Sequence, residues 1–195
     1  MKLFDDLQGL DIYLLDQFLK GRIDKESRIL DAGCGSGRNI HLLLREGYNI
    51  TGIDPNIEAI NGLKLMYPNH TKSFYHSSIE DFKSEVRFDF IICNAVLHFA
   101  DTHEHFQRMF EALQTLLTQN GVLFIRMTSD IGLSGIKEDL GAGKFLLPDA
   151  SVRYLLTRGK IDELLRTYKL SLMEPVKTVN VDELRCMTTL VLSKL

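Results

Sequence analysis

One stretch constrains the fold of this chain more than any other: residues 28–56, which read RILDAGCGSGRNIHLLLREGYNITGIDPN. An apolar segment there ends at Asp31, and a loop with glycine at every second position opens into a predicted helix from Arg38 to Glu46. A second apolar segment then ends at Asp54. Alternating glycines let the backbone turn tightly and let a ligand approach without meeting a Cβ atom. The order strand, glycine loop, helix, strand and acid predicts one half of a nucleoside-binding fold.

The sequence of the loop helps to distinguish a dinucleotide from other ligands that contain a nucleoside. A nicotinamide-binding fold also has a glycine loop followed by an acid about 20 residues later. Here, however, Arg38 stands where that fingerprint has its third glycine, and Asp31 stands two residues before Gly33. A carboxylate at that place repels a pyrophosphate but attracts a cationic ammonium or sulfonium. Asp54 is placed to accept hydrogen bonds from both hydroxyls of a ribose.

At this point the sequence resembles the class I S-adenosylmethionine (SAM) dependent methyltransferases, whose first motif reads D-x-G-x-G-x-G. Residues 31–37, DAGCGSG, match that motif position for position, and Asp54 matches the ribose-binding acid of the family. The resemblance covers roughly Arg28 to Leu195. It implies an α/β, Rossmann-like fold with a seven-stranded, mostly parallel sheet, an antiparallel last strand and helices on both faces.

The resemblance also implies SAM as the cofactor and S-adenosylhomocysteine (SAH) as its product. The glycine loop would approach the methionine part, Asp31 would face its ammonium, and Pro55 and Asn56 would pack beside the ribose and adenine. Cys34 is interpreted as a small residue in a tight loop, without a chemical role. The complete set of expected cofactor contacts is Asp31, Gly33, Cys34, Gly35, Gly37, Asp54, Pro55, Asn56, Ser78, Ile79, Asn94, Ala95 and Val96.

The later members of this set follow the third and fourth predicted strands. Many relatives carry an acid after the third strand that binds the adenine amino group, but Ser78 stands at that place here. Its hydroxyl can accept from the amino group, and the backbone N–H of Ile79 can bond a ring nitrogen. After the fourth strand, Asn94 is expected to hold the ammonium mainly through its carbonyl group. Ala95 and Val96 are expected to line the methyl pocket.

His98 is the candidate catalytic residue. A histidine here can orient a substrate hydroxyl, amine or thiol, or take its proton, and the alternative is a histidine that only packs near the rim. The residues that follow raise the question of a metal site: Asp101, His103, Glu104 and His105. We expect no metal, because Asp101 is better used as the cap of the helix that begins at this point.

The chain is expected to form one domain over residues 1–195. Residues 1–25 form a leader with a helix over 3–20, which either covers the mouth of the site or simply packs against the fold. Residues 129–150 contain four glycines and are predicted to be an irregular loop or lid that contacts the substrate. Two final strands, 170–179 and 184–194, have a short connection and should pair as an antiparallel hairpin.

Composition excludes some classes of partner. The net charge of −3 and the pI near 6.1 give no broad electrostatic footprint for nucleic acid or for an anionic membrane surface. The three cysteines are widely spaced and odd in number, which predicts free thiols in a reducing compartment. The first residues lack the pattern of a signal peptide. We therefore expect a cytoplasmic protein without a nucleic-acid or membrane partner.

Taken together, the sequence predicts a methyltransferase that transfers the SAM methyl group to a small-molecule acceptor by in-line displacement. No N-P-P-Y-type tetrapeptide follows the fourth strand, since residues 94–97 read NAVL. The leader helix, the loop at 129–150 and the region of Phe99 are expected to form the acceptor pocket. Two alternatives stay open: a regulatory protein that binds SAM or SAH without turnover, and a nicotinamide-dependent oxidoreductase. The acceptor, its nucleophilic atom and the oligomeric state are not determined.

Overall fold

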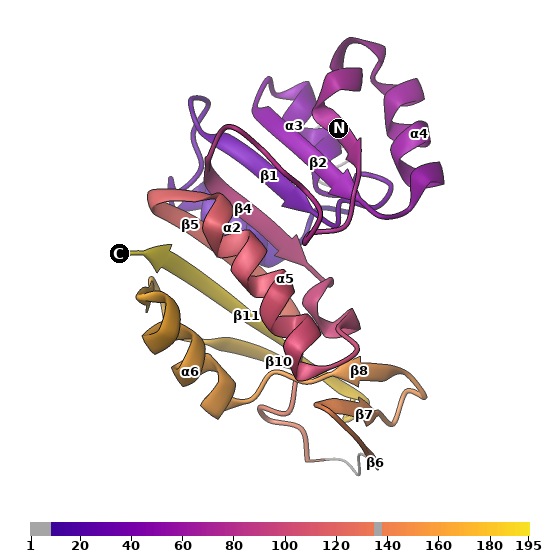
Figure 1. Cartoon of the computed structure of the whole chain (residues 1–195), viewed down its shortest axis with the longest axis vertical. Coiled ribbons are helices and arrows are strands. Elements are labelled where there is room, and N and C mark those ends of the chain that lie inside the picture. Colours follow the sequence, from indigo (N-terminus) through magenta and orange to yellow (C-terminus); the bar gives the residue numbers. More distant parts are fainter. Residues whose placement is uncertain (1–8, 135–137) are drawn as a thin grey trace.

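The computed structural model describes residues 9–134 and 138–195, in which eight of the strands form one open, mostly parallel sheet (Figure 1). Its eight strands are β1 (Arg28–Ala32), β2 (Asn49–Asp54), β3 (Phe74–His76), β4 (Phe88–Asn94), β5 (Leu117–Ser129), β9 (Leu170–Leu172), β10 (Lys177–Val181) and β11 (Arg185–Lys194). The order is β10–β11–β5–β4–β1–β2–β3, and β9 also pairs with β11. Strands β1 to β5 pair in parallel, whereas β11 is antiparallel to its neighbours. The expected fold class is confirmed.

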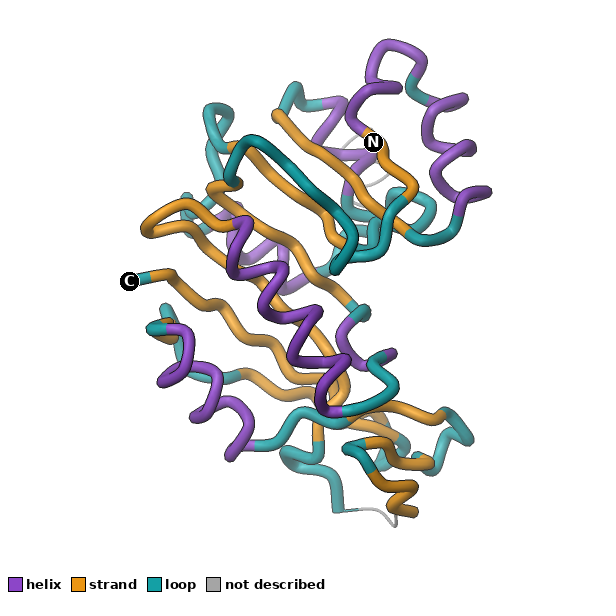
Figure 2. Tube along the Cα trace, viewed as in Figure 1, coloured by secondary structure: helices purple, strands orange, loops and turns teal. Residues whose placement is uncertain are grey.

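Helices cover both faces of this sheet (Figure 2). They are α2 (Ile12–Leu19), α3 (Ile40–Arg45), α4 (Ile57–Met66), α5 (His103–Leu116) and α6 (Arg158–Tyr168), with short 3₁₀ segments at η1 (Pro68–Ser73) and η2 (Leu97–Phe99). Helices α5 and α6 contribute to one buried apolar cluster, and α2, α3 and α4 contribute to the other. No helix within the described ranges is long and apolar enough to cross a membrane.

Strand β4 shows how the sequence builds both clusters at once. Successive side chains of a strand point to opposite faces, so a strand covered on both sides must be apolar throughout. Ile91 and Cys93 belong to the cluster under α5, while Phe90 and Ile92 belong to the cluster under α3. All four are fully buried. The sequence of β4, FDFIICN, is almost entirely apolar, as is typical of a central parallel strand covered on both faces.

The sheet has one strand more than expected. The segment predicted as a single strand over 170–179 is divided into β9 and β10, which both pair with β11. Pro175 lies between them. A proline has no N–H to donate to a ladder, so it interrupts strand pairing at this point. The antiparallel hairpin of the last two strands is confirmed, with β10 paired to β11 from Lys177↔Thr189 to Val181↔Arg185.

The prediction of an irregular segment at 129–150 is wrong. This part of the chain contains β6 (Glu138–Gly141) and β7 (Lys144–Leu146), which with β8 (Val152–Tyr154) form a small antiparallel sheet. Ala142 and Gly143 have positive φ angles of 52° and 85°, and they close the turn between β6 and β7. Gly143 is one of the four glycines on which the prediction of a loop rested, but in this place it helps to make a tight hairpin turn. Residues 135–137 lie outside the described ranges.

Two predicted boundaries also move. Helix α5 is capped by Thr102, whose hydroxyl accepts the His105 N–H at 3.1 Å, and not by Asp101. Helix α3 begins two residues later than predicted because the chain first makes turns, with the Gly37 N–H bonded to the Cys34 carbonyl at 2.9 Å. The first part of the helix predicted over 3–20 lies outside the described residues, up to residue 8. Within them, α2 begins at Ile12, after the cap residue Asp11.

Candidate functional site

The carboxyl ends of β4, β1, β2 and β3 lie side by side, and the glycine loop crosses them. The backbone N–H groups of Gly33 and Cys34 both donate to the Ile53 carbonyl, at 2.8 and 2.9 Å, which ties the loop to the end of β2. On the other side, a Cβ added to Gly33 would lie 2.3 Å from Cγ2 of Val96. Only glycine lets the end of β1 approach the segment after β4 this closely.

Asp31, at the end of β1, is a buried carboxyl group. Its Oδ2 atom has no hydrogen-bond partner within the described part of the chain. Burial raises the pKa of Asp31 to about 7, an effect that Arg38 opposes and Asp54 increases. A buried polar atom without a partner is costly, so it commonly marks a place where a ligand supplies the missing contact.

Asn94, at the end of β4, is a second group of this kind. Both polar atoms of its side-chain amide are buried and lack a partner among the described residues. The next residue, Ala95, has a positive φ of 63°, and its N–H donates to the Arg126 carbonyl at 2.7 Å. A non-glycine residue in this conformation stores strain, and such residues cluster at functional sites.

Asp54, at the end of β2, faces the same loop. Its Oδ2 accepts the Gly35 N–H at 2.8 Å, and its Oδ1 accepts the Asn56 N–H at 2.8 Å. Each carboxylate oxygen can accept a second bond, so both remain available to ligand hydroxyls. Apart from its chain neighbours, no atom of the described residues lies within 4 Å of a Cβ built on Gly35. Asn56 also caps α4, through the N–H groups of residues 58 and 59.

Two members of the predicted set have a packing role that the sequence did not indicate. A Cβ on Gly37 would lie 2.5 Å from Cδ2 of Leu63, so this glycine lets the loop pack against α4. The Cys34 side chain belongs to the apolar cluster, and burial raises the pKa of its thiol. Neither Cys34 nor the other two cysteines forms a disulfide.

A mostly apolar pocket of about 310 Å³ lies beside this loop. It contains five of the predicted contacts, and its lining is Gly33, Pro55, Ser77, Ser78, Ile79, Glu80, Val96, Phe99, His105 and Met109. The Ser78 hydroxyl donates to Asp81 at 2.8 Å in this structure. Its oxygen keeps a lone pair for a ligand donor.

A second pocket, of about 260 Å³, adjoins the ends of β4 and β5. Its lining combines Asn94, Ala95 and the nearby His98 with residues far away in the sequence: Arg38, Arg126, Thr128, Arg153, Val181, Arg185 and Met187. The sequence did not predict its arginines. The one available signal was Arg126, a charged residue inside the apolar run of β5.

His98 lies at the wall of this second pocket and is buried. Its Nδ1 accepts the backbone N–H of Thr128 at 3.3 Å, so in the neutral ring the proton is on Nε2. Burial, together with Arg153 and Arg185, lowers the pKa of His98 to about 4. The ring is therefore neutral near pH 7 and offers a donor, which favours orientation of a substrate over removal of a proton.

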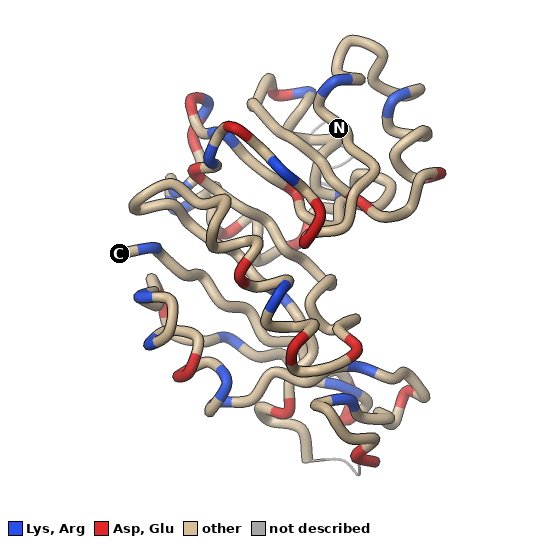
Figure 3. The backbone as a smooth tube through the Cα atoms, viewed as in Figure 1, with Lys and Arg blue, Asp and Glu red and all other residues tan. Residues whose placement is uncertain are grey.

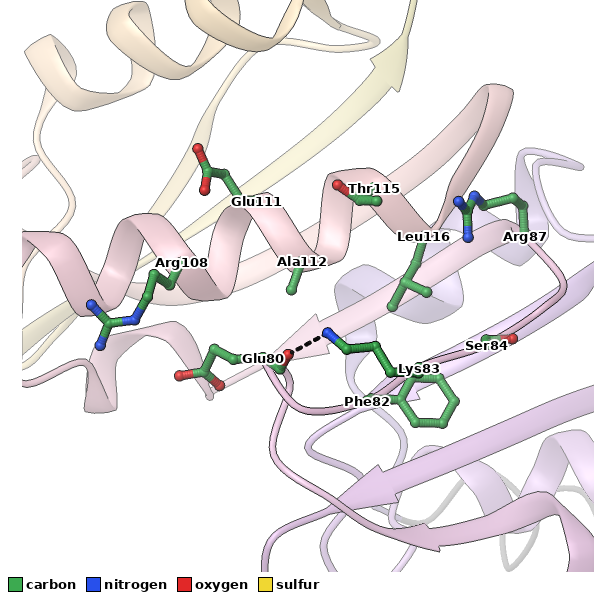
Figure 4. Close-up of a pocket in the computed structure, with 10 residues that line it drawn as sticks. All are labelled: Glu80, Phe82, Lys83, Ser84, Arg87, Arg108, Glu111, Ala112, Thr115 and Leu116. Carbon is green, nitrogen blue, oxygen red and sulfur yellow. Dashed lines mark hydrogen bonds between the residues drawn. The ribbon is translucent and has the colours of Figure 1, made fainter.

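The largest pocket, of about 500 Å³, lies elsewhere (Figure 4). Its walls are α5, including Arg108 and Glu111, and the segment before β4, where Lys83 donates to the Glu80 carbonyl at 3.1 Å. Charges of both signs line it, and the glycine loop does not. Within the described residues, no group of three or more His, Cys, Asp or Glu side chains is arranged to hold a metal ion.

Comparisons with known proteins agree with this geometry. The sequence profile of the family described as "Methyltransferase domain" matches residues 11–174. A trans-aconitate 2-methyltransferase of Enterobacter sp. (strain 638) is 31% identical over 111 residues, which are 56% of this chain and 42% of that protein. A ubiquinone biosynthesis O-methyltransferase of Rickettsia canadensis (strain McKiel) is 34% identical over 87 residues, 40% of this chain and 34% of that protein.

A solved structure shows the same fold. The magnesium protoporphyrin IX methyltransferase of Synechocystis PCC 6803, crystallised with bound SAM, superposes with a TM-score of 0.70 at 15% identity. The match covers 97% of this chain and 79% of that one. The chain spans less than half the length of the curated relatives named above.

Proposed function

We propose that this chain, which belongs to the family of methyltransferase domains, transfers a methyl group from SAM to a small-molecule acceptor. Both relatives named above are, by their names, methyltransferases of small molecules. The observation that carries the proposal is the pair of buried groups at Asp31 and Asn94, which lack a partner among the described residues and lie on adjacent strands next to the glycine loop.

These groups fit the methionine end of SAM. An ammonium has only donors, and Asp31 Oδ2 and Asn94 Oδ1 are both acceptors without a partner in the described chain. They stand on adjacent strands, since β1 pairs with β4 at Asp31↔Ile92. A pyrophosphate, by contrast, would bring negative charge to a site that already contains Asp31 and Asp54.

The remaining predicted contacts are assigned by the same reasoning. Asp54 would take the two ribose hydroxyls, with Pro55 and Asn56 beside the sugar. Ser78 and the Ile79 N–H would bind the adenine within the mostly apolar pocket. Ala95 and Val96, which connect the two pockets, would line the path of the methyl group.

When bound, SAM supplies an electrophilic methyl group on a sulfonium. The residues of this chain need only hold donor and acceptor in line and exclude water, because alignment alone accounts for a large part of the rate in such displacements. His98 would orient the acceptor through its Nε2–H. The three free cysteines fit a reducing, cytoplasmic location.

Thermal unfolding with SAM, SAH or NAD tests the cofactor. A ligand at about 100 times its dissociation constant stabilises the folded state by about 2.7 kcal/mol, which is a shift of several degrees. We expect stabilisation by SAM and SAH but not by NAD. Stabilisation by NAD alone would overturn the proposal, and binding of SAM without methylation of any acceptor would favour the regulatory alternative.

The ribose assignment has its own test. Asp54→Ala should weaken SAM binding at least several-fold in calorimetry, because it removes both acceptors for the ribose hydroxyls and releases the Gly35 N–H. Asp162→Ala, at an exposed position on α6, is the matched control and should bind SAM as the parent does. Equal affinity in Asp54→Ala would remove Asp54 from the site.

A further inference from the structure

The pocket next to Asn94 and Ala95 carries concentrated positive charge. Four arginines line it, at positions 38, 126, 153 and 185, and no carboxylate of the described chain does. Elsewhere, cationic and acidic positions are interspersed along the chain (Figure 3). The charge of this pocket is thus a local feature of a chain whose net charge is −3. A small pocket with several guanidinium groups is suited to an anion.

Three of these arginines are held from outside the pocket. Arg126 pairs with Asp11 of the leader at 3.1 Å, and Arg185 pairs with Asp149 at 2.9 Å. The Arg153 guanidinium lies 4.9 Å from the centre of the Phe99 ring. Fixing a guanidinium in advance reduces the entropy lost when it binds a ligand.

These contacts do not use all the hydrogen-bond donors of the arginines. Arg126 Nε is buried and has no partner within the described residues. Each guanidinium has five N–H donors, so a single paired carboxylate leaves several of them free. The pocket therefore keeps unused donors of fixed geometry, which match the paired oxygens of a carboxylate.

Among its described lining residues, the same pocket has no side chain that can take a proton from a substrate near pH 7. Arginine does not lose its proton in proteins. The Nδ1 of His98 already accepts the Thr128 N–H, so its other nitrogen carries the proton and can only donate. A hydroxyl or an ammonium acceptor would have to lose a proton before or during methyl transfer. A carboxylate is already an anion with a free electron pair near pH 7.

We propose that the methyl acceptor is a small carboxylate, bound by Arg126, Arg153 and Arg185, and that a carboxylate oxygen receives the methyl group. This inference rests on the proposed methyl transfer. The oxygen lone pair forms the new O–CH₃ bond as the S–CH₃ bond breaks, and the electron pair of that bond stays on sulfur. A carboxylate and a sulfonium become a methyl ester and a neutral thioether, so no proton moves.

The pocket volume sets the size of the acceptor. At about 260 Å³ it is slightly smaller than the usual range for drug-sized ligands, so polycyclic acceptors are disfavoured. Suitable probes are tricarballylate and trans-aconitate, with trimethyl tricarballylate as the neutral analogue. Inorganic phosphate tests whether any small anion suffices.

The experiment measures thermal unfolding in the presence of SAH with each probe, and then mass spectrometry of each probe incubated with SAM. We expect one or both carboxylates to raise the unfolding temperature further and to gain one methyl group. Alkali should release that group as methanol, as it does from an ester. Neither the neutral analogue nor phosphate should stabilise the protein.

Substitutions of the pocket arginines test where the carboxylate binds. Arg153→Met and Arg185→Met should each weaken binding of the carboxylate at least tenfold while leaving the affinity for SAH unchanged. Arg153→Lys keeps the charge but loses the paired donors, and it should fall between parent and Arg153→Met. Arg87→Met, at an exposed position in the largest pocket, is the matched control and should behave as the parent.

Different outcomes separate this inference from the proposed function. If SAH itself fails to stabilise the protein, the proposed methyl transfer is wrong and this inference falls with it. If SAH binds but no carboxylate does, or phosphate binds equally well, the inference alone is overturned. The same holds if a neutral phenol or an amine is methylated at a rate that Arg153→Met and Arg185→Met do not change.

Discussion

The two pockets of this protein are built in different ways. The glycine loop that borders the first pocket, and the acid Asp54 that faces it, come from residues 28–56, one short stretch in which strand, loop, helix and acid follow one another. The rest of that pocket's lining comes from residues 77–80, 96, 99, 105 and 109. The arginine-lined pocket takes residues from β4, β5, β8 and β11, and Arg38 and Arg185 at its two limits are far apart in the chain. The loop of the first pocket is a local motif, whereas the arginine cluster of the second exists only when the sheet has formed.

This difference predicts how each pocket responds to substitution. A local motif depends on backbone conformation, so its weak points are glycines with positive φ angles. An assembled pocket depends on side chains presented by rigid strands, so its residues can be replaced with little effect on the fold. His98 lies between the two, since it follows β4 and is bonded to β5 through Thr128.

The largest effect should come from the glycine loop. Gly33→Ala places a methyl group 2.3 Å from Val96 at a φ of +84°, so we expect a loss of about 2–3 kcal/mol of stability and at least 100-fold in SAM affinity. Gly35→Ala is the informative partner, because the added Cβ meets no atom of the described residues within 4 Å, its chain neighbours aside. It should stay folded and still lose SAM affinity, as denaturant unfolding and calorimetry would show. Unchanged affinity in Gly35→Ala would mean that the ligand does not approach this loop.

The next effect concerns stability at low pH. The pKa of His98 is lowered to about 4, whereas an unfolded histidine titrates near 6.5. As the pH falls below about 6.5 the unfolded state takes up a proton that the folded state does not, so stability is lost down to pH 4. By linkage this costs about 2 kcal/mol at pH 5. The substitution His98→Asn keeps an acceptor for the Thr128 N–H, and the variant should not show this loss of stability at low pH.

Denaturant unfolding of the parent and of His98→Asn at pH 7.5 and 5.0 measures this loss of stability. The difference between parent and His98→Asn isolates the histidine from other titrating groups, among them Asp31, whose raised pKa acts in the opposite direction. If the two proteins lose the same stability between these pH values, His98 is not held neutral in the folded state.

A smaller effect is expected for SAM binding as a function of pH. Since the pKa of Asp31 is about 7, its carboxyl group is mostly neutral at pH 6.0 and mostly charged at pH 7.5. Affinity for the cationic cofactor should therefore rise about eightfold over this interval. Asp31→Asn should bind SAM weakly at both pH values. Calorimetry that finds equal pH dependence in the two proteins would assign the dependence to another group.

The smallest effect is expected at Cys34. Its side chain is buried in an apolar cluster, and its thiol pKa is raised, so the reactive thiolate is scarce near pH 7. Cys34→Ala should change SAM affinity by less than about twofold and cost about 1 kcal/mol of stability for the small cavity. Rapid alkylation of the parent at Cys34 by iodoacetamide, detected by mass spectrometry, would contradict this.

The sequence predicted well where a residue acts through its own backbone or its immediate neighbours. Asp31 and Asp54 lie at the ends of β1 and β2, as their positions in the sequence suggest, and β4 is buried on both faces. The predictions failed where pairing between strands decides the structure. Residues 138–154 form a small antiparallel sheet instead of an irregular loop, because strand pairing supplies what local propensity does not.

The sequence by itself determined the parallel sheet, the glycine loop and the acids at the ends of β1 and β2, because each follows from residue order over a short span. Only the tertiary structure decided that Arg126, Arg153 and Arg185 line one pocket and that His98 is a neutral donor. The reason is that charge and pKa depend on which groups are neighbours in space. Neighbours from distant strands are fixed by the register of the sheet, which no local pattern records.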